Sequence, residues 1–144
     1  MAINFFEVNE IQVTYKRRFS EADATVIKND EQAVKLFREA MENHIDHKEG
    51  FYAILLTTNM QVLGIQKISE GGITGTVVDQ RILFGAMLKA NAVSAIIAHN
   101  HPSGNLKPSQ ADRELTEKIK KSGKILDLDI LDHLIITTED YARV

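Results

Sequence analysis

Two histidines separated by one residue stand in the segment AHNHPSGNLKPSQAD, and a serine and an aspartate follow them three positions apart. On an extended strand, residues two apart point to the same side, so His99 and His101 can present two imidazoles together. Asp112 lies one helical turn after Ser109, and a helix start folded back onto the strand end would bring its carboxylate to the histidines. Two imidazoles and one carboxylate suit Zn²⁺ and leave one coordination position for water, which is typical of catalytic sites.

The same segment has a simpler interpretation. The two histidines are then polar residues at a strand end, and Pro102 and Gly104 turn the chain. Ser109 caps the following helix, and Asp112 is a first-turn carboxylate favoured by the helix dipole. Spacing alone favours this interpretation, because His-x-His pairs are common by chance.

Composition restricts the chemistry further. The chain has 144 residues, 44% of them hydrophobic, which suits one globular domain over residues 1–144. It carries 17 basic and 20 acidic residues, a balance that gives no reason to expect a dedicated nucleic-acid or membrane binder. Cysteine is absent, so a metal site must use histidines and carboxylates. With no signal peptide pattern and no apolar segment long enough to cross a bilayer, we expect a cytoplasmic protein without a membrane partner.

The hydrophobic pattern predicts strands and helices in irregular alternation, which favours an α/β fold with a mixed β-sheet flanked by helices. Helices are expected over about 31–44 after Asn29 or Asp30, over 80–91 after Asp79, and from Ser109 to Gly123. Strands are expected at 11–15, 51–58, 61–69, 92–98 and 129–137, with 51–58 and 61–69 forming an antiparallel hairpin and 92–98 buried in the centre.

The complete string HNHPSGNLKPSQAD resembles the JAB/MPN (JAMM) metalloprotease motif, which is His-x-His, seven residues, then Ser-x-x-Asp. Its HNHPSG start is specific to the RadC branch of that family. The similarity runs from about Glu10 to Ile136 and includes GFYAILLTTNMQVLGI, ISEGGITGTV, LKANAVSAIIAHNHPSGN and LDHLII. It implies the JAB/MPN, or cytidine deaminase-like, architecture. A full-length RadC protein also carries an upstream helix-hairpin-helix DNA-binding segment, for which we expect no room here, and the serine-rich end is shortened to TEDYARV.

The resemblance implies that His99, His101 and Asp112 bind zinc and that Ser109 hydrogen-bonds an oxygen of the tetrahedral intermediate. It also implies a glutamate at the start of the strand after the first helix, where this chain has HKEGFYAILL, so Glu49 is the expected general base.

Other residues of the sequence compete for a place at this site. Glu70 in ISEGG is the alternative base, although a carboxylate before two glycines is more readily a solvated turn residue. Asp132 and His133 in LDHLII also match the RadC branch and can orient a ligand through a hydrogen bond, while a satisfied structural histidine is the plainer interpretation. His44 and His47 precede Glu49 and can line the same cleft, although a solvated loop is the expectation for them.

The predicted function is a zinc-dependent metallopeptidase or isopeptidase acting on a peptide or protein substrate. A nucleobase deaminase would need His-x-Glu and Pro-Cys-x-x-Cys, which this chain lacks. The alternative is a non-catalytic or DNA-repair-associated accessory protein that binds protein or DNA. A weak DNA association would use the basic residues of 101–125, which slightly outnumber the acidic ones. The sequence leaves open the oligomeric state and whether another divalent ion replaces zinc.

Overall fold

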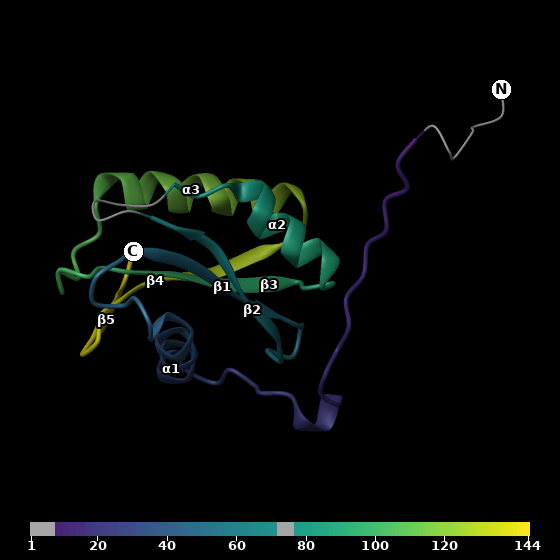
Figure 1. Cartoon of the computed structure of the whole chain (residues 1–144), viewed down its shortest axis with the longest axis horizontal. Coiled ribbons are helices and arrows are strands. Elements are labelled where there is room, and N and C mark those ends of the chain that lie inside the picture. Colours follow the sequence, from purple (N-terminus) through teal and green to yellow (C-terminus); the bar gives the residue numbers. More distant parts are fainter. Residues whose placement is uncertain (1–7, 72–76) are drawn as a thin grey trace.

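The structure, a computed structural model, describes residues 8–71 and 77–144, which form a mixed β-sheet with helices on both faces (Figure 1). The strands are, in chain order, β1 Gly50–Leu56, β2 Val62–Glu70, β3 Ser94–Asn100, β4 Asp129–Ile136 and β5 Tyr141–Arg143. They lie in the order β2-β1-β3-β4-β5, with β3 in the centre. β3 pairs parallel with β4, and the other neighbouring strands pair antiparallel. The predicted α/β class with a mixed sheet is therefore confirmed.

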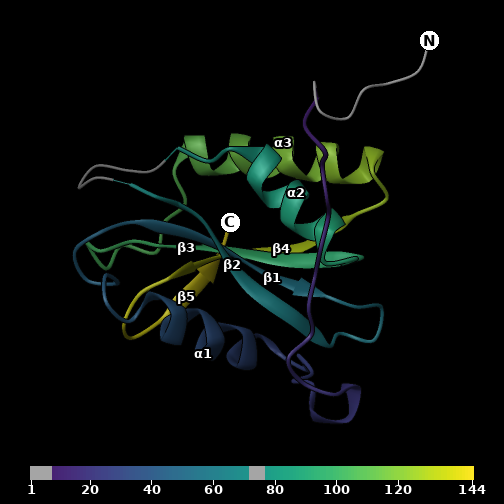
Figure 2. The same ribbon diagram turned by 45° about the vertical axis from the view of Figure 1, so that its right-hand side comes forward.

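The sheet is covered by α1 Asp30–Met41 on one face and by α2 Gln80–Lys89 and α3 Gln110–Ile125 on the other (Figure 2). Each helix begins at a polar cap, because the side chains of Asn29, Asp79 and Ser109 accept a backbone N–H two or three residues on. Such caps satisfy N–H groups that have no partner inside the helix. The three predicted helix starts are thus confirmed. None of the helices in the described ranges is long and apolar enough to cross a bilayer.

The central strands β1 and β3 are buried along their whole length and divide their side chains between two cores. Phe51 of β1 and Ile97 of β3 belong to the core beneath α2 and α3, whereas Tyr52 and Ala98 belong to the core beneath α1. Because side chains alternate along a strand, His99 continues the α3 side and Asn100 continues the α1 side. This alternation decides which residues of the HNH sequence reach the site.

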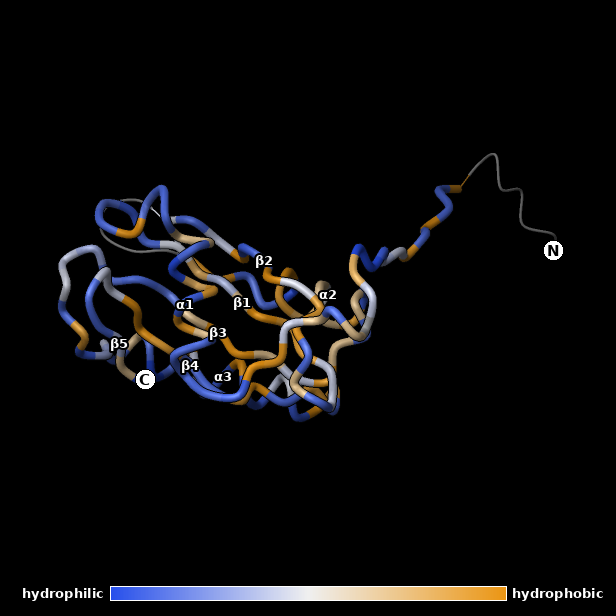
Figure 3. Tube along the Cα trace, turned by 90° about the horizontal axis from the view of Figure 1, so that it is seen from below, coloured by the Kyte–Doolittle hydropathy of each residue, from blue (hydrophilic) through white to orange (hydrophobic). Residues whose placement is uncertain are grey.

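The segment of residues 8–19 forms no strand, so the predicted strand at 11–15 is wrong. Ile11 and Val13 are 86% and 71% exposed, and Figure 3 shows hydrophobic and hydrophilic residues alternating along a tube that leaves the sheet. The start of β2 contacts a later segment of the chain, since the Val62 N–H donates to the Thr25 carbonyl at 2.7 Å. A period-two pattern alone does not make a strand, because a strand also needs backbone pairing with a neighbour.

Two further differences concern the chain after β1. The short strand β5 was not predicted, because a three-residue strand carries too little pattern to detect. Most of the glycine-rich EGGITG segment that was expected to close the hairpin, namely its residues 72–75, lies outside the described residues.

Candidate metal centre

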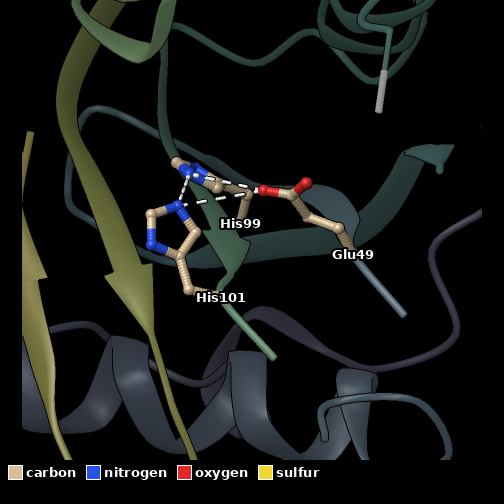
Figure 4. A group of neighbouring side chains, drawn as sticks. All are labelled: Glu49, His99 and His101. Carbon is tan, nitrogen blue, oxygen red and sulfur yellow. Dashed lines mark hydrogen bonds and ion pairs between the residues drawn. The ribbon is translucent and has the colours of Figure 1, made fainter. Parts of the chain in front are cut away.

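The end of β3 and the start of β1 lie side by side because the two strands are antiparallel, with Phe51 opposite His99. Glu49 immediately precedes β1, so this register places it beside the end of β3. The two histidines point toward the Glu49 carboxylate in Figure 4. The parallel strand β4 and the first turn of α3 border the same end of β3.

Four of the predicted site residues are brought together there. The Nε2 atoms of His99 and His101 are 2.9 Å apart, and Glu49 Oε1 lies 3.9 Å and 3.8 Å from them. Asp112 reaches the same two nitrogens, with Oδ1 3.4 Å from His99 Nε2 and Oδ2 3.6 Å from His101 Nε2. The donor atoms of Glu49, His99 and His101 lie within 4.8 Å of one another, close enough to hold a single metal ion.

Ser109, the fifth predicted residue, forms a capping box with Asp112. The Ser109 N–H donates to Asp112 Oδ2 at 2.8 Å, and the Asp112 N–H donates to Ser109 Oγ at 3.0 Å. These two bonds fix the Asp112 carboxylate at the helix start that faces the histidines. The cap interpretation is therefore confirmed, and the capping box holds the Asp112 carboxylate beside the two histidines.

Electrostatics keep the Asp112 side chain charged. Burial by itself would raise the pKa of its carboxyl, but the adjacent His99 ring and the hydrogen bonds of Ser109 outweigh burial and hold that pKa well below its usual range. Asp112 is consequently an anion throughout the neutral pH range.

The donor set fits zinc. The Nδ1 atom of His101 lies 2.6 Å from the Asn105 carbonyl oxygen, which can only accept, so Nδ1 carries the proton and Nε2 of the neutral ring is bare. Two imidazole nitrogens and carboxylate oxygens in one place are the ligands expected for Zn²⁺ in a chain without cysteine. His99 and His101 can hold such an ion together with a carboxylate, and the carboxylates of both Glu49 and Asp112 lie near their Nε2 atoms.

Comparison with known proteins shows to which family this chain belongs. A sequence model of the RadC-like JAB domain matches residues 27–143. The chain belongs to the RadC-like JAB domain family. It is 48% identical over 97 residues to a UPF0758 protein of Flavobacterium johnsoniae, covering 67% of this chain and 42% of the relative. It is 38% identical over 112 residues to a UPF0758 protein of Moorella thermoacetica, covering 78% and 48%. The RadC-like chain thus matches less than half the length of these two relatives.

In this RadC-like domain, the two glutamates considered for the role of base have different neighbours. Glu70 forms ion pairs with Lys48 at 3.8 Å and with Lys67 at 3.5 Å, whereas Glu49 is the glutamate that lies beside the paired histidines. Of the two glutamates, Glu49 is therefore the one that lies at the metal centre.

Asp132 and His133, which matched the family as a pair, face different partners. Asp132 Oδ2 accepts a hydrogen bond from Arg143 Nε at 2.7 Å, away from the metal centre. His133 is buried and its Nε2 lies 2.8 Å from Nδ1 of His99. Only His133 of this pair therefore contacts a metal-centre residue directly.

The predicted solvated loop at the two upstream histidines is wrong for His44. Its ring is 7% exposed, with Nδ1 2.9 Å from the Lys48 carbonyl oxygen and Nε2 2.8 Å from the Tyr52 hydroxyl. The ring packs so closely on Gly50 that a Cβ there would lie 2.7 Å from His44 Cε1, so only glycine fits without a shift. His47 is exposed, as expected.

Asn100, which the sequence analysis did not select, holds the loop that carries Glu49. Its side chain is fully buried, with Oδ1 accepting the Gly50 N–H at 2.8 Å. Its Nδ2 donates to the carbonyl oxygens of Ile45 and Lys48 at 2.9 Å and 2.8 Å. The sequence contained a signal for this role. Asn100 lies between two histidines that face one side of a buried strand, so its amide must face the opposite core and find hydrogen-bond partners there.

Proposed function

We propose that this RadC-like domain is a zinc-dependent hydrolase of peptide or isopeptide bonds. The observation that carries the proposal is the approach of two carboxylates, Glu49 and Asp112, to the same pair of imidazole nitrogens. One carboxylate is fixed by its capping box. The other forms no hydrogen bond within the described part of the chain, which leaves it free to exchange a proton. A purely structural zinc site would have no use for a free carboxylate at its open side.

Each residue has a separate role in the proposed reaction. His99, His101 and Asp112 would hold the zinc ion, which when bound would supply Lewis acidity toward the scissile carbonyl and toward water. Glu49 accepts the proton of the attacking water and later delivers it to the leaving nitrogen. Ser109 donates its hydroxyl proton to the oxygen that becomes negative in the tetrahedral intermediate. The oxygen of that hydroxyl already accepts the Asp112 N–H, so its position is set before substrate binds.

The partner we propose is a peptide or protein, and DNA is the weaker candidate. Acidic residues alternate with basic ones along the exposed surface of α3, and Gln110 Nε2 donates to Glu114 at 3.1 Å in the same stretch. A mixed helix surface of this kind supports at most a weak, salt-sensitive DNA association. Titration of a DNA duplex at two salt concentrations tests this. Tight binding with a steep salt dependence would favour the alternative function of a DNA-associated accessory protein.

Metal content is the first test of the proposed function. The wild-type protein, loaded with zinc and passed through a desalting column, should retain about one zinc per chain by mass spectrometry. The double variant His99→Ala, His101→Ala should retain none, while His47→Ala, which removes an exposed histidine outside the centre, should bind zinc as the wild type does. A wild-type protein that takes up no zinc would overturn the proposal.

Hydrolysis is the second test. With a panel of peptide and isopeptide-linked reporter substrates, Glu49→Gln should keep its zinc and lose about 10²–10⁴-fold in rate, the usual contribution of a general base. Glu70→Gln is the matched control and should keep both zinc and activity. Loss of activity in Glu70→Gln with full activity in Glu49→Gln would show that the base has been assigned to the wrong glutamate.

A further inference from the structure

His133 on β4 is a buried histidine outside the donor set of the metal centre. Both of its ring nitrogens have side-chain partners: Nε2 lies 2.8 Å from His99 Nδ1, and Nδ1 lies 2.5 Å from Thr116 Oγ1 on α3. The Thr116 hydroxyl also lies 2.7 Å from the backbone carbonyl oxygen of Asp112. A continuous chain of hydrogen bonds therefore leads from one proposed ligand to the backbone of another.

The protons of this chain can be assigned from its carbonyl end. The Asp112 carbonyl oxygen can only accept, so the Thr116 hydroxyl donates its one proton there. Thr116 Oγ1 must then accept from His133, which places the proton of the neutral His133 ring on Nδ1. His133 Nε2 is left as an acceptor, and His99 must donate to it from Nδ1. For neutral rings, each step follows from the one before.

The tautomer of His99 determines the state of its Nε2 atom at the metal centre. His99 carries its proton on Nδ1, so its Nε2 is bare, and the Asn105 carbonyl leaves Nε2 of His101 bare in the same way. Two bare nitrogens then face each other at 2.9 Å, with the carboxylates of Glu49 and Asp112 at their sides. Lone pairs and anions at such distances repel one another unless a metal ion or a shared proton lies among them.

Ring packing and proton placement are supplied by different residues. Phe51 stacks on the His99 ring with an interplanar angle of 6° and meets His133 edge-on at 5.3 Å between centroids. Aromatic contacts hold the planes of the rings but do not distinguish one ring nitrogen from the other. The hydrogen-bonded chain does distinguish them, because each of its acceptors sits at a defined nitrogen.

We propose that His133 and Thr116 are positioning residues that fix His99 in its Nδ1–H tautomer and link it to the α3 turn bearing Asp112. The pair, which we call the His133–Thr116 relay, thereby presents two ligands from different elements to one cation. For the identity of that cation the inference rests on the proposed function, but the tautomer is a property of the metal-free chain.

Tautomers are measured directly by nitrogen-15 NMR of the imidazoles in the zinc-free protein, at a pH high enough to keep the rings neutral. The wild type should show His99 and His133 protonated on Nδ1. Thr116→Val removes the acceptor of the His133 proton with little change in size, and should shift the His133 signals. Thr137→Val is the matched control, because Thr137 is also buried and donates to a backbone carbonyl, that of Asp140, without contacting a histidine. A wild-type His99 protonated on Nε2 would overturn the relay.

Zinc affinity, measured by competition with a chromogenic chelator, is the second readout. His133→Leu should weaken zinc binding about 10–100-fold, the usual effect of removing a group that orients a ligand. Thr116→Val should weaken it less, and Thr137→Val should leave it unchanged. Wild-type zinc affinity in a folded His133→Leu variant would overturn the relay even if zinc binding itself is established. If the wild type binds no zinc, the proposed function fails, and the NMR measurement still decides the relay.

Discussion

Two buried histidines, His44 and His99, lie on opposite faces of the central strands and differ in what their ring nitrogens meet. His44 donates from Nδ1 to the Lys48 carbonyl oxygen and accepts at Nε2 from the Tyr52 hydroxyl, so both nitrogens are satisfied by the protein. His99 is satisfied at Nδ1 by His133, but its Nε2 faces only another bare nitrogen and two carboxylates.

Burial does not distinguish these two residues, since they are 7% and 2% exposed. The distinction lies in the count of protons and acceptors around each ring. A fully satisfied buried histidine contributes hydrogen bonds and packing to stability. A buried histidine with an unsatisfied lone pair beside anions destabilises the metal-free folded chain, and binding of a cation restores that stability.

Zinc-dependent stability should separate the two histidines by the largest margin. Zinc at a thousandfold excess over its dissociation constant should raise the free energy of unfolding of the wild type by about 4 kcal/mol. His99→Ala should lose this increase, whereas His44→Leu should start less stable yet keep it. Urea unfolding with zinc and with a chelator measures both values. A folded His44→Leu variant that no longer responds to zinc would show that the two faces are not independent.

The second-largest effect is expected from acid, which should lower the stability of the folded chain through the buried His133 beside His99. Burial, followed by the charge of His99, lowers the pKa of His133 to about 3. In the unfolded chain a histidine has a pKa of about 6.5, so below that pH it binds a proton that His133 in the folded chain does not bind. The stability associated with neutral His133 is therefore complete above pH 6.5 and is lost as pH falls below it, by about 1.4 kcal/mol for each pH unit.

Unfolding of the metal-free protein between pH 6.5 and 4.5 measures this slope against His133→Gln, which has no group to titrate. The variant should show the shallower decline, because the remaining acidic and basic groups are common to both proteins. Equal slopes would mean that folding does not exclude the proton from His133.

Much of the metal centre could be predicted because its parts are local in sequence. His99, His101, Ser109 and Asp112 fall within one strand end and one helix turn, where alternation and capping rules fix their directions. Glu49 is different, since it reaches the histidines only through the antiparallel register that sets Phe51 opposite His99. Its selection came from the family resemblance, and the only local argument was against Glu70, as a carboxylate before two glycines.

The parts that were missed depend on tertiary contacts. The His133–Thr116 relay needs the parallel register of β3 and β4 and the packing of α3 over them. His44 was taken for a solvated residue because its partner Tyr52 comes near only when the loop folds over Gly50. The strand expected at 11–15 also depended on a tertiary contact, since its period-two pattern was present but residues 8–19 form no strand.

The smallest expected effect concerns His44, whose two ring nitrogens both have hydrogen-bond partners in the protein. Burial, with a further contribution from Glu70, raises the pKa of the Tyr52 hydroxyl, so it stays protonated and can donate to His44. Tyr52→Phe removes that donor and should lower the free energy of unfolding by about 1 kcal/mol, the net value of one neutral hydrogen bond. Tyr15→Phe, which loses a half-exposed hydroxyl bond to the Leu63 carbonyl, is the control and should cost less. Zinc affinity should be unchanged in both variants. A weaker affinity in Tyr52→Phe would mean that the His44 side supports Glu49 through the loop they share, and the two histidines could no longer be treated as separate cases.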